Sequence, residues 1–188
     1  MPLAALRRFS ERRRREQSAA RLYRSVVETS RQPVFFTDMG VADTLTGRFD
    51  LLILNAYLLL RRLGIIQDSL QDEARAVSQA TFDLMFADMD QNLREIGVTD
   101  TGIGKRVRRM AEAFYGRVAA YDQAGEEGGA ALAEALRRNL YKDADPTPVQ
   151  VEAMMDYIAR QKECLTGQSD AVLLGGEVTL FVPEGAKA

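Results

Sequence analysis

Apolar residues recur every three or four positions along most of this chain, the spacing that places them on one side of an α-helix. Glycine, proline and short polar residues divide this pattern into segments. The pattern predicts helices at about 3–30, 49–63, 69–96 and 103–124, a shorter one around Leu132, Leu136 and Leu140, and a last one that opens at Asp145-Pro146 or Thr147-Pro148 and ends near Leu165. Residues 33–48 are predicted as loop, and residues 178–182 as a short strand at most. The chain is therefore predicted to be all-α, a single compact bundle of five to six helices with an irregular C-terminal tail.

The segment Phe49–Leu63 is apolar on nearly every side, which predicts a helix at the centre of the core. Its longest apolar run, Leu51–Leu60, has ten residues, contains Asn55 and is bounded by Asp50 and Arg61. A membrane-spanning helix needs about 20 such residues, so we interpret the run as a buried core helix.

The helix predicted over 69–96 carries a stripe rich in phenylalanine and methionine. The stripe consists of Phe82, Met85, Phe86, Met89, Leu93 and Ile96. Such stripes are more often core than binding surface, so we predict that most of it is buried. Met85 and Met89 are the predicted exceptions, because flexible thioethers suit adaptable surfaces. Asp83 and Asp90 flank the stripe, whereas Asp88 lies far around the helix, so one helix cannot bring the three carboxylates to one metal ion.

The next predicted helix is basic. A connector with Gly97, Gly102 and Gly104 precedes it, and Thr99, Asp100 and Thr101 offer oxygens that can cap its start. Its predicted buried side consists of Ile103, Val107, Met110, Phe114 and Tyr121, and its predicted exposed side of Lys105, Arg106, Arg108, Arg109 and Arg117. These cations suit the preceding acidic helix or an anionic partner. Together the two helices indicate a surface that grips another polypeptide.

The chain has 188 residues, 46% of them hydrophobic, which suits one well-formed core. We predict one helical domain at 32–166, a basic amphipathic segment at 1–31 and a tail at 167–188. Histidine is absent, which excludes Ser-His-Asp and Cys-His catalysis and imidazole metal sites. The single cysteine, Cys164, has no intrachain partner and fits a reducing compartment. We therefore predict a protein that is not an enzyme, with no catalytic residue, metal or cofactor.

Charge is unevenly distributed along the chain. Residues 1–31 hold nine arginines and three glutamates, or +6, and the net charge of −2 leaves −8 for the remainder. No secretory signal is evident in this region. One interpretation is attachment to an anionic surface, either lipid headgroups or ribosomal RNA; the other is a solvated, frayed terminus. The predicted attachment residues are Arg7, Arg8, Arg12, Arg13, Arg14 and Arg15.

Four segments in this order resemble the ubiquinol-cytochrome c chaperone family. They are Arg48–Leu63, Phe82–Arg94, Gly97–Lys105 and Phe114–Tyr121, within a resemblance that covers roughly residues 33–145. The resemblance implies a mostly helical assembly factor for respiratory complex III that binds newly made cytochrome b. In mitochondria, a small partner protein and the exit region of the ribosome take part. Without a transit peptide, this chain resembles the bacterial form. Asn55 departs from the family pattern, in which a histidine is common in that helix.

This resemblance gives the main expectation: a chaperone for cytochrome b, cytoplasmic and peripheral to the inner membrane, held at an anionic membrane surface. The expected client-binding residues are Phe82, Met85, Phe86 and Met89, rimmed by Asp83, Asp90 and Arg94. The alternative is a ribosome- or RNA-binding adaptor that acts through the arginine-rich N-terminus. A third hypothesis is an enzyme that uses carboxylates with a metal. We expect no DNA partner.

Overall fold

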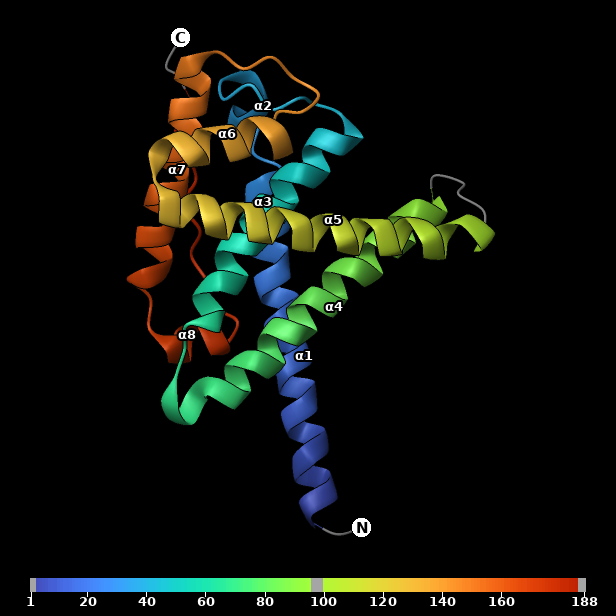
Figure 1. Ribbon diagram of the computed structural model, residues 1–188. Coiled ribbons are helices and arrows are strands. Elements are labelled where there is room, and N and C mark those ends of the chain that lie inside the picture. The colour runs from blue at the N-terminus through green and yellow to red at the C-terminus, as the bar shows by residue number, and fades with distance from the viewer. Residues whose placement is uncertain (1–2, 96–99, 186–188) are drawn as a thin grey trace.

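Eight α-helices and one 3-10 helix make up most of the described chain, which comprises residues 3–95 and 100–185 of the computed structural model. They are α1 (Leu3–Ser30), α2 (Val34–Thr37), α3 (Leu45–Gly64), the 3-10 helix Asp68–Leu70, α4 (Gln71–Glu95), α5 (Asp100–Glu127), α6 (Gly129–Asn139), α7 (Pro148–Thr166) and α8 (Asp170–Leu174). No strand occurs within these two ranges, so the predicted all-α class is confirmed (Figure 1). The short helices α2 and α8 are additions to the predicted set.

Helix α3 lies at the centre of the molecule, as its apolar sequence predicted. Leu51, Ile53 and Leu59 have no exposed surface, and the helix packs against α1, α4, α5 and α7. It begins four residues before its predicted start, because the Thr44 hydroxyl caps it and accepts a hydrogen bond from the Gly47 N–H at 3.1 Å. A Cβ at Gly47 would lie 2.1 Å from the Ala42 carbonyl oxygen, so only glycine fits this first turn.

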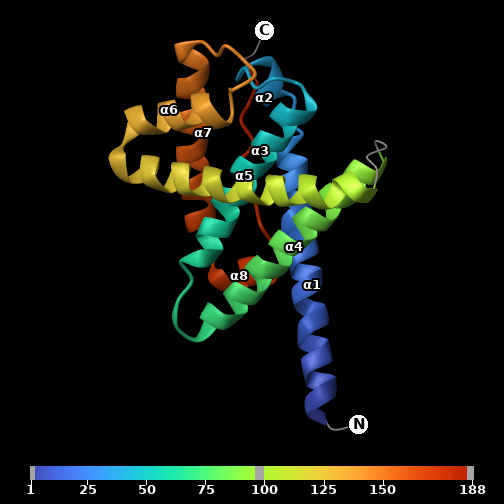
Figure 2. The same cartoon turned by 45° about the vertical axis from the view of Figure 1, so that its right-hand side comes forward.

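Helix α1 packs along α4 and α3, and its N-terminal part extends beyond the rest of the molecule in both views (Figures 1 and 2). Leu22 and Val26 belong to the core. Farther toward the N-terminus, Arg14 and Arg15 form ion pairs with Glu73 of α4 at 2.9 and 2.6 Å. These pairs hold the projecting part of α1 to the body.

Replacing Glu73 with glutamine is expected to loosen α1 from α4. Burial opposes ionisation of this carboxyl, but hydrogen bonds and charge from Arg15 and Arg14 outweigh burial and hold the pKa of Glu73 below its ordinary value of 4.5. Because the pKa of Glu73 is lower in the folded state, the ionised carboxylate stabilises the fold at pH values above 4.5. This contribution is lost as the pH falls through the lowered pKa. We expect Glu73→Gln to cost about 1 kcal/mol at neutral pH, after allowing for solvent screening.

The measurement is urea denaturation at neutral and acidic pH, followed by circular dichroism. The difference between wild type and Glu73→Gln should shrink as pH falls below 4.5. The matched control is Glu11→Gln, because Glu11 pairs with Arg7 within α1 and that pair is exposed. An undiminished difference in acid, or an equal effect of the control, would contradict this assignment.

Helices α4 and α5 pack against each other, and their adjoining ends project from the body (Figures 1 and 2). Helix α5 begins three residues before the predicted start and runs through Gly102 and Gly104, so these glycines do not interrupt it. The helical cost of a glycine is only about 1 kcal/mol, which a continuous helix tolerates. Residues 96–99, and the side chains of Leu93, Asp100, Thr101, Ile103, Lys105 and Arg106, lie outside the described residues.

The last long helix, α7, opens at the second of its two predicted starts. The Thr147 hydroxyl accepts a hydrogen bond from the Gln150 N–H, and the Gln150 side chain accepts one from the Thr147 N–H, which forms a capping box. After α8, residues 177–185 run without helix or strand beside α7. The Gln168 side chain bonds both backbone groups of Thr179 at 2.8 Å, and the Phe181 ring packs on Tyr157. The tail therefore contributes to the fold.

Candidate functional site

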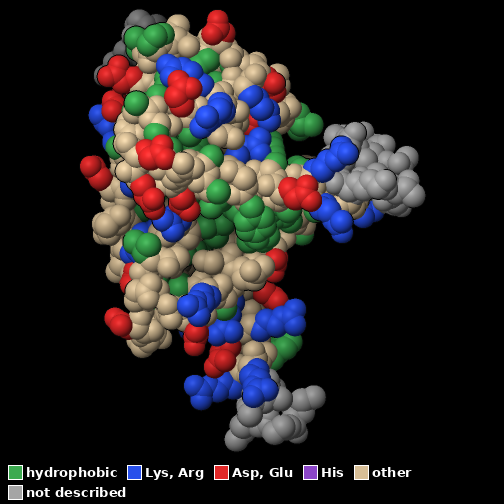
Figure 3. All heavy atoms as spheres, in the orientation of Figure 1, with side chains coloured by type: hydrophobic (Ala, Val, Ile, Leu, Met, Phe, Trp, Pro, Cys, Tyr) green, Lys and Arg blue, Asp and Glu red, His purple; other side chains and the backbone are tan. Residues whose placement is uncertain are grey.

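Four aromatic side chains meet where α4 packs on α5, and we name them the aromatic patch: Phe82, Phe86, Phe114 and Tyr115. The Phe82 ring centroid lies 4.6 Å from that of Phe86, 5.2 Å from Phe114 and 5.7 Å from Tyr115. Phe114 is buried and Phe82 and Phe86 are half-buried, but Tyr115 is 60% exposed. Figure 3 shows hydrophobic side chains gathered between α5 and α4. The fold leaves this apolar surface uncovered.

A hollow of about 400 Å³ adjoins the aromatic patch, between α3, α4 and α5. It is lined by the apolar side chains of Leu60, Leu63, Ile66, Phe82 and Phe114, and by polar groups of Gln71, Arg75, Ser78 and Gln79. An apolar floor with a polar rim suits an apolar helix face of another polypeptide, whose side chains insert at helical spacing.

The fold divides the binding stripe that the sequence predicted. Phe82 and Phe86 lie in the aromatic patch, whereas Met85 and Met89 are 1% and 5% exposed and belong to the core. The expectation that the two methionines are the exposed members is therefore wrong. Helices α1 and α3 pack on α4, and both methionines belong to the buried core. Tyr115 was missed, since the stripe on α4 gives no information about which residues of α5 lie beside it.

The acidic rim residues of α4 have local partners. Asp83 accepts a hydrogen bond from the Gln79 side chain at 2.8 Å, and Asp90 pairs with Arg94 at 2.8 Å. Asp88, on another side of α4, accepts a hydrogen bond from the Tyr23 hydroxyl, and burial together with this bond raises the pKa of Tyr23. Among the described residues, no group of three or more Cys, Asp and Glu side chains is placed to hold a metal ion.

A second cavity, which we name the α1 pocket, has a volume of about 290 Å³ and lies between α1, α3, α4 and α5. Its apolar lining consists of Val27, Leu45, Phe49, Leu52, Met89 and Met110, and its polar lining of Tyr23, Ser30, Arg31, Arg48, Asp88 and Asn92. Arg31 and Arg48 are both exposed; Arg48 pairs with Asp43 at 2.6 Å, whereas Arg31 makes no ion pair within the described ranges. The pocket thus combines an apolar interior with one exposed arginine, Arg31, that has no ion pair among the described residues.

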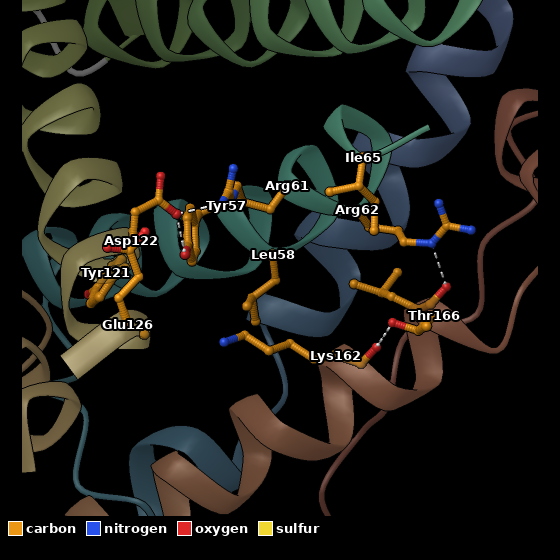
Figure 4. Close-up of a pocket in the computed structure, with 12 residues that line it drawn as sticks. Tyr57, Leu58, Arg61, Arg62, Ile65, Tyr121, Asp122, Glu126, Lys162 and Thr166 are labelled. Carbon is orange, nitrogen blue, oxygen red and sulfur yellow. Dashed lines mark hydrogen bonds and ion pairs between the residues drawn. The ribbon is translucent and has the colours of Figure 1, made fainter. Parts of the chain in front are cut away.

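A third cavity, between α3, α5 and α7, has several charged side chains in its lining (Figure 4). Asp122 accepts a hydrogen bond from the Tyr57 hydroxyl at 2.8 Å and pairs with Arg61 at 3.0 Å. Burial and the Asp122 carboxylate raise the pKa of Tyr57. Arg62 pairs with Asp170 at 2.6 Å. These groups satisfy one another and join helices, so we interpret this cavity as a structural junction.

A buried carboxylate connects α3 to α5. Asp50 is 1% exposed, lies 2.6 Å from the Arg117 guanidinium and pairs with Lys142 at 3.0 Å. Arg117 was predicted on the exposed side of its helix, and this prediction is wrong, because the residue is 8% exposed. Its position facing α3 is stabilised by the charge of Asp50.

The predicted attachment arginines have different surroundings. Arg7 and Arg12 pair with glutamates one turn away in α1, and Arg14 and Arg15 pair with Glu73. Arg8 and Arg13 are exposed and make no ion pair within residues 3–95 and 100–185. In the described part of the chain, no helix has both the length and the apolar character needed to cross a membrane.

Known proteins are similar to this chain in sequence. The ubiquinol-cytochrome-c reductase complex assembly factor 1 of Xenopus laevis is 28% identical over 165 residues, which cover 86% of this chain and 79% of that protein. The corresponding Mus musculus protein is 27% identical over 165 residues, 86% of this chain and 54% of the relative, so the chain spans about half its length.

The fold is also that of a solved structure. The crystal structure of the Cbp3 homolog from Brucella abortus superposes with a TM-score of 0.79 at 33% sequence identity, covering 96% of this chain and 97% of that one. Residues 37–181 match the family described as ubiquinol-cytochrome C chaperone, a range that extends past residue 145 into the C-terminal tail. The chain belongs to the ubiquinol-cytochrome C chaperone family.

Proposed function

We propose that this protein is a non-enzymatic assembly chaperone that binds newly synthesised cytochrome b and supports the biogenesis of respiratory complex III. The family and the names of the two vertebrate relatives, both assembly factors of the ubiquinol-cytochrome c reductase complex, support the assembly role. The observation that carries the client proposal is the partly exposed aromatic patch beside a hollow with an apolar floor.

Cytochrome b is a bundle of apolar membrane helices, so its unfinished form exposes helix faces that aggregate unless they are covered. In our proposal one such face lies on the aromatic patch and inserts side chains into the adjoining hollow. Asp83, Asp90 and Arg94 keep the rim polar, so that the empty surface stays hydrated. Met85 and Met89 are excluded as contacts because the core covers them.

We propose that the protein works at the cytoplasmic face of the inner membrane as a peripheral protein. The basic N-terminal part of α1 projects from the body and would be attracted by anionic lipid headgroups (Figure 1). The family and the relatives named above give no support to a ribosome- or RNA-binding adaptor, and we do not propose one.

Affinity purification of the tagged full-length protein from cells, followed by identification of bound proteins, tests the client. We expect cytochrome b among the bound proteins, enriched when complex III assembly is stalled, together with any small partner chaperone. Deletion of the gene should deplete complex III and leave the other respiratory complexes at wild-type levels. Unchanged complex III, or purification that never recovers cytochrome b, would rule the proposal out.

A further inference from the structure

One edge of α1 carries three exposed arginines that make no ion pair among the described residues. Arg13, Arg24 and Arg31 are exposed, and none of them makes an ion pair within the two described ranges. They are 11 and 7 residues apart, close to whole numbers of helical turns, so they lie on one side of the helix. The line they form, which we name the basic edge, is about 27 Å long.

The basic edge faces away from the protein. The opposite side of α1 is buried through Ala19, Leu22 and Val26. Phe9 precedes Arg13 by one turn and is 67% exposed, which adds a large apolar side chain to the same end of the helix. An exposed helix edge with unpaired arginines and an exposed phenylalanine is typical of helices that lie on an anionic bilayer.

The basic edge ends at the α1 pocket. Arg31 is the last residue of the edge and lines the pocket with Val27, while Arg48 reaches the mouth from α3. Leu45, also in the lining, is 72% exposed. Arg48 pairs with Asp43 at 2.6 Å and Asp88 accepts a hydrogen bond from Tyr23, so Arg31 is the arginine of the lining that has no ion pair among the described residues. Arg31 therefore offers a guanidinium without an ion pair beside an apolar interior.

We infer that the basic edge lies on an anionic phospholipid surface, and that the α1 pocket receives an acyl chain of one such lipid while Arg31 binds its phosphate. Guanidinium groups bind phosphate oxygens in pairs, and the apolar lining suits methylene groups. The inference rests on the proposed attachment to the membrane. It assigns that attachment to Arg13, Arg24 and Arg31, of which only Arg13 belongs to the predicted Arg7–Arg15 run. RNA would use the same arginines but would leave the apolar pocket empty.

Co-sedimentation of the full-length protein with vesicles tests the basic edge. We expect binding to vesicles of phosphatidylcholine mixed with phosphatidylglycerol, and little binding to phosphatidylcholine alone. Arg24→Gln and Arg31→Gln should each weaken binding about fivefold, because each arginine near an anionic membrane surface contributes about 1 kcal/mol of binding free energy. The control is Arg138→Gln on α6, since Arg138 is also exposed and should change nothing. Equal binding to both vesicle types would overturn the inference. So would undiminished binding by the double variant Arg24→Gln/Arg31→Gln.

The fluorescence of cis-parinaric acid, an anionic acyl probe that brightens in apolar surroundings, tests the pocket. We expect saturable binding that weakens at least about fivefold in Met110→Trp, which narrows the pocket, and in Arg31→Gln. Two results overturn the pocket assignment. One is the absence of saturable probe binding to the wild type. The other is an Arg31→Gln variant that loses affinity for RNA, measured in parallel, but binds vesicles as the wild type does. If vesicle binding fails while cytochrome b still co-purifies, this inference is wrong and the proposed function stands. If cytochrome b fails to co-purify while vesicle binding is intact, the proposed function is wrong and this inference stands.

Discussion

Asp50→Ala is expected to lower the free energy of unfolding by about 3–5 kcal/mol, because it leaves the Arg117 guanidinium buried without its carboxylate. Asp50 is 1% exposed, and the Arg117 side chain is 10% exposed. The neighbouring Lys142 side chain is 37% exposed, so it can turn to water and should add little to the loss. The effect exceeds that of the Glu73 pair, whose arginines are more accessible to solvent.

Urea denaturation followed by circular dichroism measures this loss. The double variant Asp50→Leu/Arg117→Met should recover most of the stability, because replacing both charges removes the unpaired buried cation. Asp143→Ala is the control, since Asp143 is exposed in the connection after α6. An Asp50→Ala variant within about 1 kcal/mol of wild type would show that Arg117 finds another partner or reaches water.

The same site shows what the sequence could predict about the fold. The position of α3 at the centre followed from its apolar residues on every side. Asp50 borders the apolar run Leu51–Leu60, and its burial could not be predicted from the sequence around it. The partners that bury it, in α5 and after α6, are distant in sequence. Arg117 was placed on the exposed side for the same reason, since a helical pattern treats every cation as solvated unless its partner is known.

Asn55 illustrates this limit within the core. The sequence shows a polar residue in an apolar run, but not its partners. In the structure its side chain donates to the Ser30 hydroxyl at 2.9 Å and accepts from the Tyr157 hydroxyl, which links the end of α1 and the middle of α7 through α3. An amide suits this place because it has both a donor and an acceptor. The position is therefore a buried hydrogen-bonding junction.

The binding stripe was predicted in part. Helical spacing identified Phe82 and Phe86, but spacing on one helix cannot show which of its sides a neighbour covers. Met85 and Met89 are buried in the core, and α5 brings Tyr115 to the partly exposed aromatic side of α4. The aromatic patch is thus a property of two helices together, and Tyr115 is its most exposed member.

Tyr115→Asp is expected to weaken binding of an apolar cytochrome b helix by at least about thirtyfold, because a central aromatic contact commonly contributes 2 kcal/mol or more. The substitution also places a carboxylate where the client's apolar surface would exclude water. Stability should change by less than about 1 kcal/mol, because Tyr115 is 60% exposed before binding. Fluorescence anisotropy of a labelled peptide that corresponds to one cytochrome b membrane helix measures the affinity, and urea denaturation measures the stability.

The matched control is Val149→Asp, which introduces the same charge at an apolar residue of α7 that is 72% exposed. An equal loss of peptide affinity in this control would mean that added negative charge alone weakens binding, and the aromatic patch would lose its assigned role.

Salt provides an independent check. Burial of apolar surface is little screened by ions, so peptide affinity should persist at salt concentrations that abolish vesicle binding by the basic edge. If both activities disappear together as salt rises, the client too is held by charge, and the aromatic patch is not its binding surface.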